Sequence, residues 1–186
     1  MIYTLKTKYK HLTQKWDFCG ATCLQMILFR HDIWQEQEDI AFTIETHIKP
    51  EHTNRFSHPF PAWNPWLRIM NFKGEIIQNY LSHFGFLATV YKYSDFKSSD
   101  FEEKVIESLR NDGDMMIAFH RGEIDPEKNH GHYVLLSEYN SDTKIITVCD
   151  PTPKTKNFWE VNIEVMYNHM SAQRDRERGI VIIKSM

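Results

Sequence analysis

Residues 115–149 constrain the fold more than any other stretch, because apolar segments alternate there with a short polar turn. Residues 115–119 form a continuous apolar run, which predicts a buried strand. Residues 133–139 and 144–149 are β-rich and flank the turn-forming residues 140–142. These patterns predict an antiparallel hairpin next to a buried strand.

The remaining patterns predict helices in the first part of the chain and strands in the second. The spacing predicts helices over 19–30, 34–46, 67–84, 100–110 and 160–170, and further strands over 2–5, 86–93 and 179–184. Residues 52–66, rich in proline and aromatics, preclude a regular helix, and either wall a cleft or pin a long loop onto the core. The order favours one domain, 1–186, with an α+β fold: N-terminal helices packed on an antiparallel sheet of about five strands.

Composition excludes several classes of protein. A net charge of −3 leaves no basic footprint for nucleic acid, and no apolar run approaches the ~20 residues that cross a bilayer. The N-terminus turns polar and basic at once, unlike a signal peptide. Three cysteines form no disulfide framework, which indicates a reducing compartment. We expect a cytoplasmic protein, or one delivered to a host cytosol by a signal-independent route, and the sequence sets no oligomeric state.

Cys19 stands at the start of the first helical pattern. The residues after it place an apolar stripe on one face of a helix, and Asp17 is a suitable N-cap. A thiol in the first turn lies where the helix dipole favours a negative charge, which promotes the nucleophilic thiolate. Gln14, just upstream, could direct a side-chain N–H at a developing oxyanion. The alternative is a buried structural cysteine.

A cysteine nucleophile needs a base, and His132 is the best placed of the ten histidines. It begins the first strand of the predicted hairpin, after Gly131, a residue that permits close backbone approach or an unusual dihedral. Asp150 ends the second strand, so hairpin pairing should bring it beside His132. Asp150 could then fix the imidazole tautomer while the other ring nitrogen faces Cys19. The alternative is a solvent-exposed histidine and an ordinary Asp-Pro turn.

Zinc is the rival use of these side chains. Cys19, Cys23, His130 and His132 could supply four ligands, but Cys23 falls on the apolar face of its helix and the spacing is not that of paired ligands. We therefore expect no metal and no cofactor. His120, at the end of the 115–119 strand, is a distant alternative base.

Three motifs in this order resemble the peptidase C39-like branch of the papain-like cysteine proteases. They are Q…DFCGA around Cys19, GHYVLL beginning at Gly131 and VCDP ending at Pro151. That branch carries Q…CG before its first helix, GHY or GHF at a strand start and DP at the end of the next strand. Residues 66–84 and 176–183 also resemble C39-like proteins described as guanylyl-cyclase-domain-containing.

The resemblance implies a role for each candidate residue: Cys19 as nucleophile, His132 as general base and acid, Asp150 as its orienter, and Gln14 as oxyanion donor. It implies hydrolysis or transfer of an amide or acyl bond through a thioester, with a peptide, protein or small amide as substrate. The alternative is a guanine-nucleotide-related or non-catalytic binding protein with the same fold. The chain carries neither a P-loop nor a glycine-rich phosphate cradle.

Overall fold

The computed structural model describes residues 1–60, 74–121, 131–153, 156–171 and 178–186. Its elements are, in chain order, β1 (Ile2–Thr4), α1 (Cys19–Arg30), α2 (Gln37–Thr43), η1 (Pro50–Arg55), α3 (Gly74–Ser82), β2 (Phe86–Lys92), η2 (Tyr93–Asp95), α4 (Ser98–Arg110), β3 (Asp114–His120), β4 (Gly131–Asn140), β5 (Ile145–Cys149), β6 (Phe158–Asn162), α5 (Ile163–Ser171) and β7 (Gly179–Ser185).

One antiparallel sheet organises the described residues. Its strand order is β2-β7-β3-β4-β5-β6, and β1 pairs with β4 beside that path. The predicted hairpin is present as β4 and β5, which pair with Leu135 opposite Cys149. The predicted strand over 115–119 is β3, which lies between β4 and β7 and is buried along its whole length. The sheet is larger than the five strands that we predicted, with seven among the described residues.

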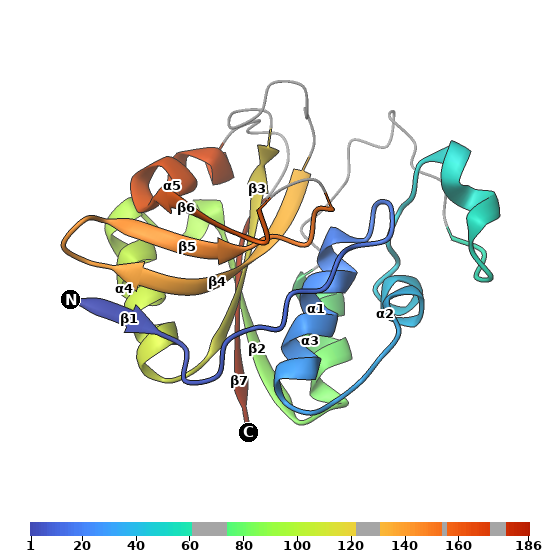
Figure 1. The fold of residues 1–186 in the computed structure, drawn as a ribbon, viewed down its shortest axis with the longest axis horizontal. Helices are drawn as coiled ribbons and strands as arrows, with labels where there is room; N and C mark the ends of the chain where they lie inside the picture. The colour runs from blue at the N-terminus through green and yellow to red at the C-terminus, as the bar shows by residue number, and fades with distance from the viewer. Residues whose placement is uncertain (61–73, 122–130, 154–155, 172–177) are drawn as a thin grey trace.

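Helices cover the sheet from two sides. Figure 1 shows α1, α2 and α3 gathered on one side, with α4 and α5 on the other. This arrangement explains why β3 reads as a continuous apolar run, because both of its faces pack against helices. The predicted fold class, α+β with N-terminal helices on an antiparallel sheet, is confirmed.

The central helix α1 is more deeply buried than its sequence indicates. Every residue from Ala21 to Leu28 is buried, so the helix is enclosed and does not present one apolar stripe. Its two buried polar side chains each make a hydrogen bond: Thr22 Oγ1 donates to Gln37 Oε1 at 3.0 Å, and Gln25 Nε2 donates to the Gln35 carbonyl at 2.7 Å, whereas Gln25 Oε1 has no hydrogen-bond partner among the described residues. Buried polar groups that find partners avoid the cost of desolvation.

Other boundaries also differ from the sequence-based prediction. The second helix, α2, is shorter than 34–46, and the predicted 160–170 helix is divided into strand β6 and helix α5. Strand β6 pairs with β5, and this non-local pairing overrides the helical pattern. Residues 67–73 of the predicted third helix lie outside the described residues. The predicted stop at Gly85 is confirmed by its φ of +80°, which glycine adopts without strain.

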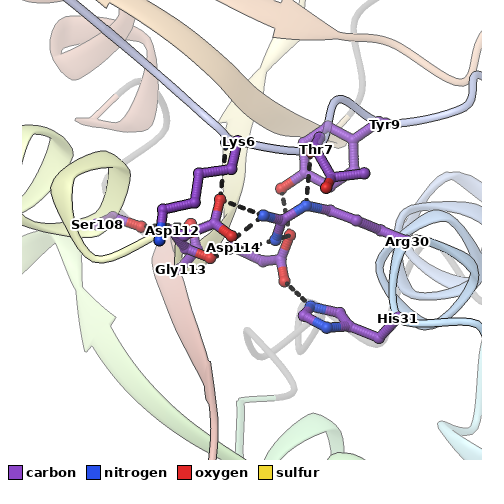
Figure 2. Close-up of polar contacts among 9 residues, drawn as sticks. All are labelled: Lys6, Thr7, Tyr9, Arg30, His31, Ser108, Asp112, Gly113 and Asp114. Carbon is purple, nitrogen blue, oxygen red and sulfur yellow. Dashed lines mark hydrogen bonds and ion pairs between the residues drawn. The ribbon is translucent and has the colours of Figure 1, made fainter.

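A buried polar cluster fixes the C-terminal end of α1 (Figure 2). Arg30 Nη1 donates to Asp114 Oδ1 at 2.9 Å, Arg30 Nη2 pairs with Asp112, and Arg30 Nε donates to the Thr7 carbonyl at 2.7 Å. Tyr9 Oη donates to Asp114 Oδ1 at 2.7 Å. The cluster joins the N-terminal segment, α1 and the start of β3, so it holds the helix that carries Cys19.

Candidate active site

Cys19, His132 and Asp150 come from three different elements. Cys19 is the first residue of α1 and is half-buried. His132 is the second residue of β4, and Asp150 directly follows β5. The last two are 3% and 1% exposed, respectively, so their polar atoms must find partners inside the protein.

The hairpin brings His132 and Asp150 together as the sequence predicts. His132 Nε2 lies 2.8 Å from Asp150 Oδ1, a hydrogen-bond distance, and the Thr152 backbone N–H donates to the same oxygen at 2.9 Å. Burial opposes the charged carboxylate, but these hydrogen bonds and the charge of His132 outweigh burial and hold the pKa of Asp150 well below its usual range. Asp150 is therefore an anion at neutral pH.

Cys19 is the other group that acts on His132. Burial alone would lower the pKa of the imidazole, but the hydrogen bond to Asp150, the interaction with Cys19 and the charges of both raise it to about 9. Since Asp150 engages Nε2, the nitrogen left for Cys19 is Nδ1. The imidazole is then protonated at neutral pH and provides a positive charge beside the Cys19 side chain.

The start of α1 packs directly against β4. A Cβ added to Gly20 would lie 3.4 Å from the Tyr133 ring, so the backbone next to Cys19 sits against the strand that carries His132. The first turn of α1 holds no acidic residue, which leaves its N-terminal end free of competing negative charge. Gly131 does not have the special geometry that we predicted. Its φ is not positive, and an added Cβ would come no closer than 3.6 Å to Arg178.

Gln14 is tied to the turn that follows Asp150. Its backbone N–H donates to the Pro151 carbonyl at 2.8 Å, which anchors it next to Asp150. Its side-chain Nε2 donates to the Trp16 carbonyl at 2.6 Å, and Oε1 is buried without a hydrogen-bond partner among the described residues. The amide retains a second N–H for another acceptor. Its role as an oxyanion donor stays a prediction.

Asp17 is not the N-cap of α1, contrary to our prediction. Phe18 occupies that position and makes no side-chain capping bond. The Asp17 carboxylate accepts instead from the Lys49 backbone N–H at 3.0 Å and pairs with His52 Nδ1 at 3.2 Å. It therefore fastens the η1 turn to the segment that leads into Cys19.

Aromatic residues near that turn pack against the core. Phe56 and Phe60 pack against Phe18, with ring centroids 4.8 Å and 5.3 Å from that of Phe18, so this part of the 52–66 segment pins a loop onto the core. Trp16, 46% exposed, lies against the His52 ring at 4.3 Å, with the Arg55 guanidinium 3.9 Å from its centroid. Residues 61–66 lie outside the described residues, so the cleft interpretation remains untested there.

Three residues that the sequence analysis did not single out surround Asp150. Trp159 Nε1 donates to Asp150 Oδ2 at 3.0 Å, Thr152 contacts both His132 and Asp150, and Arg121 forms an ion pair with Asp150 at 3.8 Å. Trp159 lies just before the predicted helix over 160–170 and Arg121 just after the predicted strand over 115–119, so no sequence pattern marked either residue. The Asp-Pro-Thr turn was the available signal for Thr152.

Metal ligation receives no support from the part of the chain that the structure describes, where no group of three or more His, Cys, Asp or Glu side chains could hold an ion. His130, one of the four candidate zinc ligands, lies outside the described residues. His120 is buried at the end of β3, as its strand position suggested. Among the described helices, none is both long and apolar enough to span a membrane.

Residues 6–175 match the profile of the Peptidase_C39 like family. No match is found among curated proteins. A search of solved structures finds a double glycine motif protease from an AMS/PCAT transporter, in complex with its leader peptide. It has a TM-score of 0.56 and 15% identity, and the match covers 100% of this chain and 99% of that one.

Two further solved structures are similar. One is a C39-like peptidase candidate from Bacillus anthracis, with a TM-score of 0.61, 14% identity and coverage of 99% of this chain and 98% of that one. The other is the peptidase domain of Streptococcus ComA, a bifunctional ABC transporter of a quorum-sensing pathway. It has a TM-score of 0.57, 13% identity and coverage of 96% and 99%. At these identities, the likeness establishes the fold.

Proposed function

Because the chain belongs to the Peptidase_C39 like family, we propose that it is a cysteine peptidase, or a related amide or acyl hydrolase or transferase, with Cys19, His132 and Asp150 as its triad. The observation that carries the proposal is the row Cys19, His132 and Asp150, in which His132 Nε2 lies 2.8 Å from Asp150 Oδ1 and Cys19 lies close enough to raise the pKa of the imidazole. Its order, thiol to imidazole to carboxylate, is the arrangement that cysteine nucleophiles require.

The proposed reaction has two stages. The Cys19 thiolate attacks the carbonyl carbon, and His132 donates its proton to the leaving amine as the C–N bond breaks, which leaves a thioester on Cys19. His132 then takes a proton from water or from an incoming amine, and attack on the thioester releases an acid or a new amide. General acid–base transfer of this kind contributes about 10²–10⁴-fold to the rate.

The oxyanion of each tetrahedral intermediate requires donors. The Cys19 backbone N–H, at the N-terminus of α1, is one candidate, and the second N–H of the Gln14 amide is the other. We propose a peptide as substrate, in keeping with the leader peptide bound to one structurally similar protease.

Alkylation of Cys19 by iodoacetamide, followed by mass spectrometry in wild type and His132→Ala, tests the triad. We expect rapid labelling of Cys19 in wild type and labelling at least about tenfold slower at pH 7 in the variant, because the imidazolium no longer favours the thiolate. Cys23 and Cys149 are internal controls in the same chain. Burial raises the pKa of both thiols, that of Cys149 to about 12.

The opposite result is equally clear. If Cys19 is labelled as slowly as Cys23 and Cys149, and His132→Ala leaves its rate unchanged, the triad is not assembled in the free protein. The non-catalytic binding module then becomes the better explanation of the fold.

Turnover is tested with a peptide library and mass spectrometry of the products. We expect Cys19→Ala to abolish all cleavage while its stability stays within about 1 kcal/mol of wild type, because Cys19 is only half-buried. Cleavage that persists in Cys19→Ala would contradict the mechanism.

A further inference from the structure

Arg121 carries a buried positive charge next to the proposed triad. It directly follows β3 and is 6% exposed. Nη1 donates to Thr152 Oγ1 at 2.7 Å, and Nη2 lies 3.8 Å from Asp150 Oδ2. Arginine is almost never buried unless it is paired, so Thr152 and Asp150 are the partners that make burial of this guanidinium possible.

The two oxygens of Asp150 have different surroundings. Oδ1 accepts from the Thr152 backbone N–H and faces His132, whereas Oδ2 accepts from the Trp159 indole and faces the Arg121 guanidinium. Thr152 Oγ1, held by Arg121, also lies 3.2 Å from His132 Nε2. Arg121 therefore reaches His132 by two routes, through the carboxylate and through the hydroxyl.

The charge of Arg121 affects how tightly His132 holds its proton. If the imidazolium were the only counter-charge of a buried carboxylate, the proton would be held strongly on the ring. A second cation on the same carboxylate shares that attraction and has the same sign as the imidazolium. Both effects ease the release of a proton from His132.

We propose that Arg121 is a positioning residue that orients Asp150 and Thr152 and offsets the carboxylate charge, so that His132 can pass its proton to the leaving group. This inference rests on the proposed function, because it assigns Arg121 a role within the same triad. Arg121 acts through Asp150 and Thr152, and we do not place it in contact with the reacting atoms.

Other ionisable groups approach His132 from the elements packed around it. Among the described residues they are Cys19 on α1, Asp150 after β5, His120 and Arg121 at the end of β3, and Arg178 before β7, whose guanidinium lies close to Gly131. Arg121 forms an ion pair with Asp150. Two neutral rings also pack here: the ring centroids of Phe119 and His132 are 5.7 Å apart, and those of Trp159 and Phe119 are 6.2 Å apart.

An NMR titration of the full chain with labelled histidine tests the proposal. The His132 signal is identified by its absence from His132→Ala. In Arg121→Met, we expect the His132 midpoint to rise by about one pH unit, because the carboxylate keeps its charge and the competing cation is gone. In Arg121→Lys, which keeps the cation, the midpoint should return to within a few tenths of a unit of wild type.

Circular dichroism establishes that each variant folds. Arg121→Gln replaces Arg121→Met if the latter does not fold, with the same upward shift expected. A merely structural Arg121 predicts an unchanged midpoint, or a lower one as Asp150 moves away, and either result overturns the proposal. A midpoint that rises in Arg121→Met without recovery in Arg121→Lys overturns it too.

Cys19 alkylation in His132→Ala separates this failure from failure of the proposed function. If His132→Ala slows alkylation while the Arg121 variants leave the His132 midpoint unmoved, the triad stands and the role of Arg121 is wrong. If His132→Ala has no effect on alkylation, the proposed function itself fails.

Discussion

Replacing Arg30 with methionine should destabilise the fold severely, because it removes the central cation of the buried cluster in Figure 2. The Arg30 and Asp114 side chains are each 2% exposed, and Asp112 is 27% exposed. Arg30 donates from all three guanidinium nitrogens, to both carboxylates and to the carbonyls of Thr7 and Asp112. The variant leaves Asp114 buried with only Tyr9 and His31 as partners among those the structure shows.

The expected cost follows from the asymmetry of buried ion pairs. Removing one partner from such a pair costs about 3–5 kcal/mol, because the remaining charge is left without compensation. For a chain of this length, each kcal/mol corresponds to about 2–4 °C, so Tm should fall by about 6–20 °C. The assay is urea unfolding followed by circular dichroism, with thermal melts in parallel.

Lys184→Met is the matched control for Arg30→Met. Lys184 pairs with Glu107 at 2.9 Å, but the two side chains are 43% and 59% exposed. Exposed pairs contribute about 0–1 kcal/mol, so this variant should remain close to wild type. If Arg30→Met loses less than about 1 kcal/mol and matches Lys184→Met, the reasoning about the buried cluster is refuted.

Two further predictions concern stability. His132 has a pKa in the folded chain of about 9, above its ordinary value of 6.5, so its contribution to stability is fully present below about pH 6.5 and is lost as pH rises through 9. The urea midpoint of unfolding should therefore fall less steeply between pH 6 and 10 in His132→Gln than in wild type. Parallel curves for the two proteins would contradict this. In urea unfolding, Gly179→Ala should cost well over 3 kcal/mol, because the new Cβ would lie 1.9 Å from the Tyr91 carbonyl oxygen. Gly85→Ala has open space around its Cβ and should cost about 1 kcal/mol from the positive φ alone. Equal losses in the two variants would show that the contact at Tyr91 relaxes freely.

Local patterns predicted the pairing at the centre of the site. The turn at residues 140–142 joins two adjacent β-rich segments, so the antiparallel pairing of β4 and β5 follows from short-range geometry, and a bulge between Leu136 and Glu138 then shifts the register by one residue. That register brings Asp150 to His132, and their hydrogen bond confirms the predicted contact. The first helix begins at Cys19 as predicted.

Local patterns failed where distant segments compete for the same groups. Asp17 has the chemistry of an N-cap, but Lys49 and His52 occupy its carboxylate. Residues 160–162 begin the predicted helix, yet they belong to strand β6, which pairs with β5. In both cases, a tertiary contact contributes more than the modest local preference of about 1 kcal/mol.

The sequence by itself determined the fold class, the hairpin and the order of Cys19, His132 and Asp150 along the chain. Only the tertiary structure decided the strand order β2-β7-β3-β4-β5-β6, and with it which side chains enclose the Asp150 carboxylate. Arg121 and Trp159 lie 29 and 9 residues from Asp150 in the sequence, yet both reach Oδ2. Contacts of this kind depend on which strands lie side by side in the sheet. That order is set by the packing of the entire core, which no short stretch of sequence encodes.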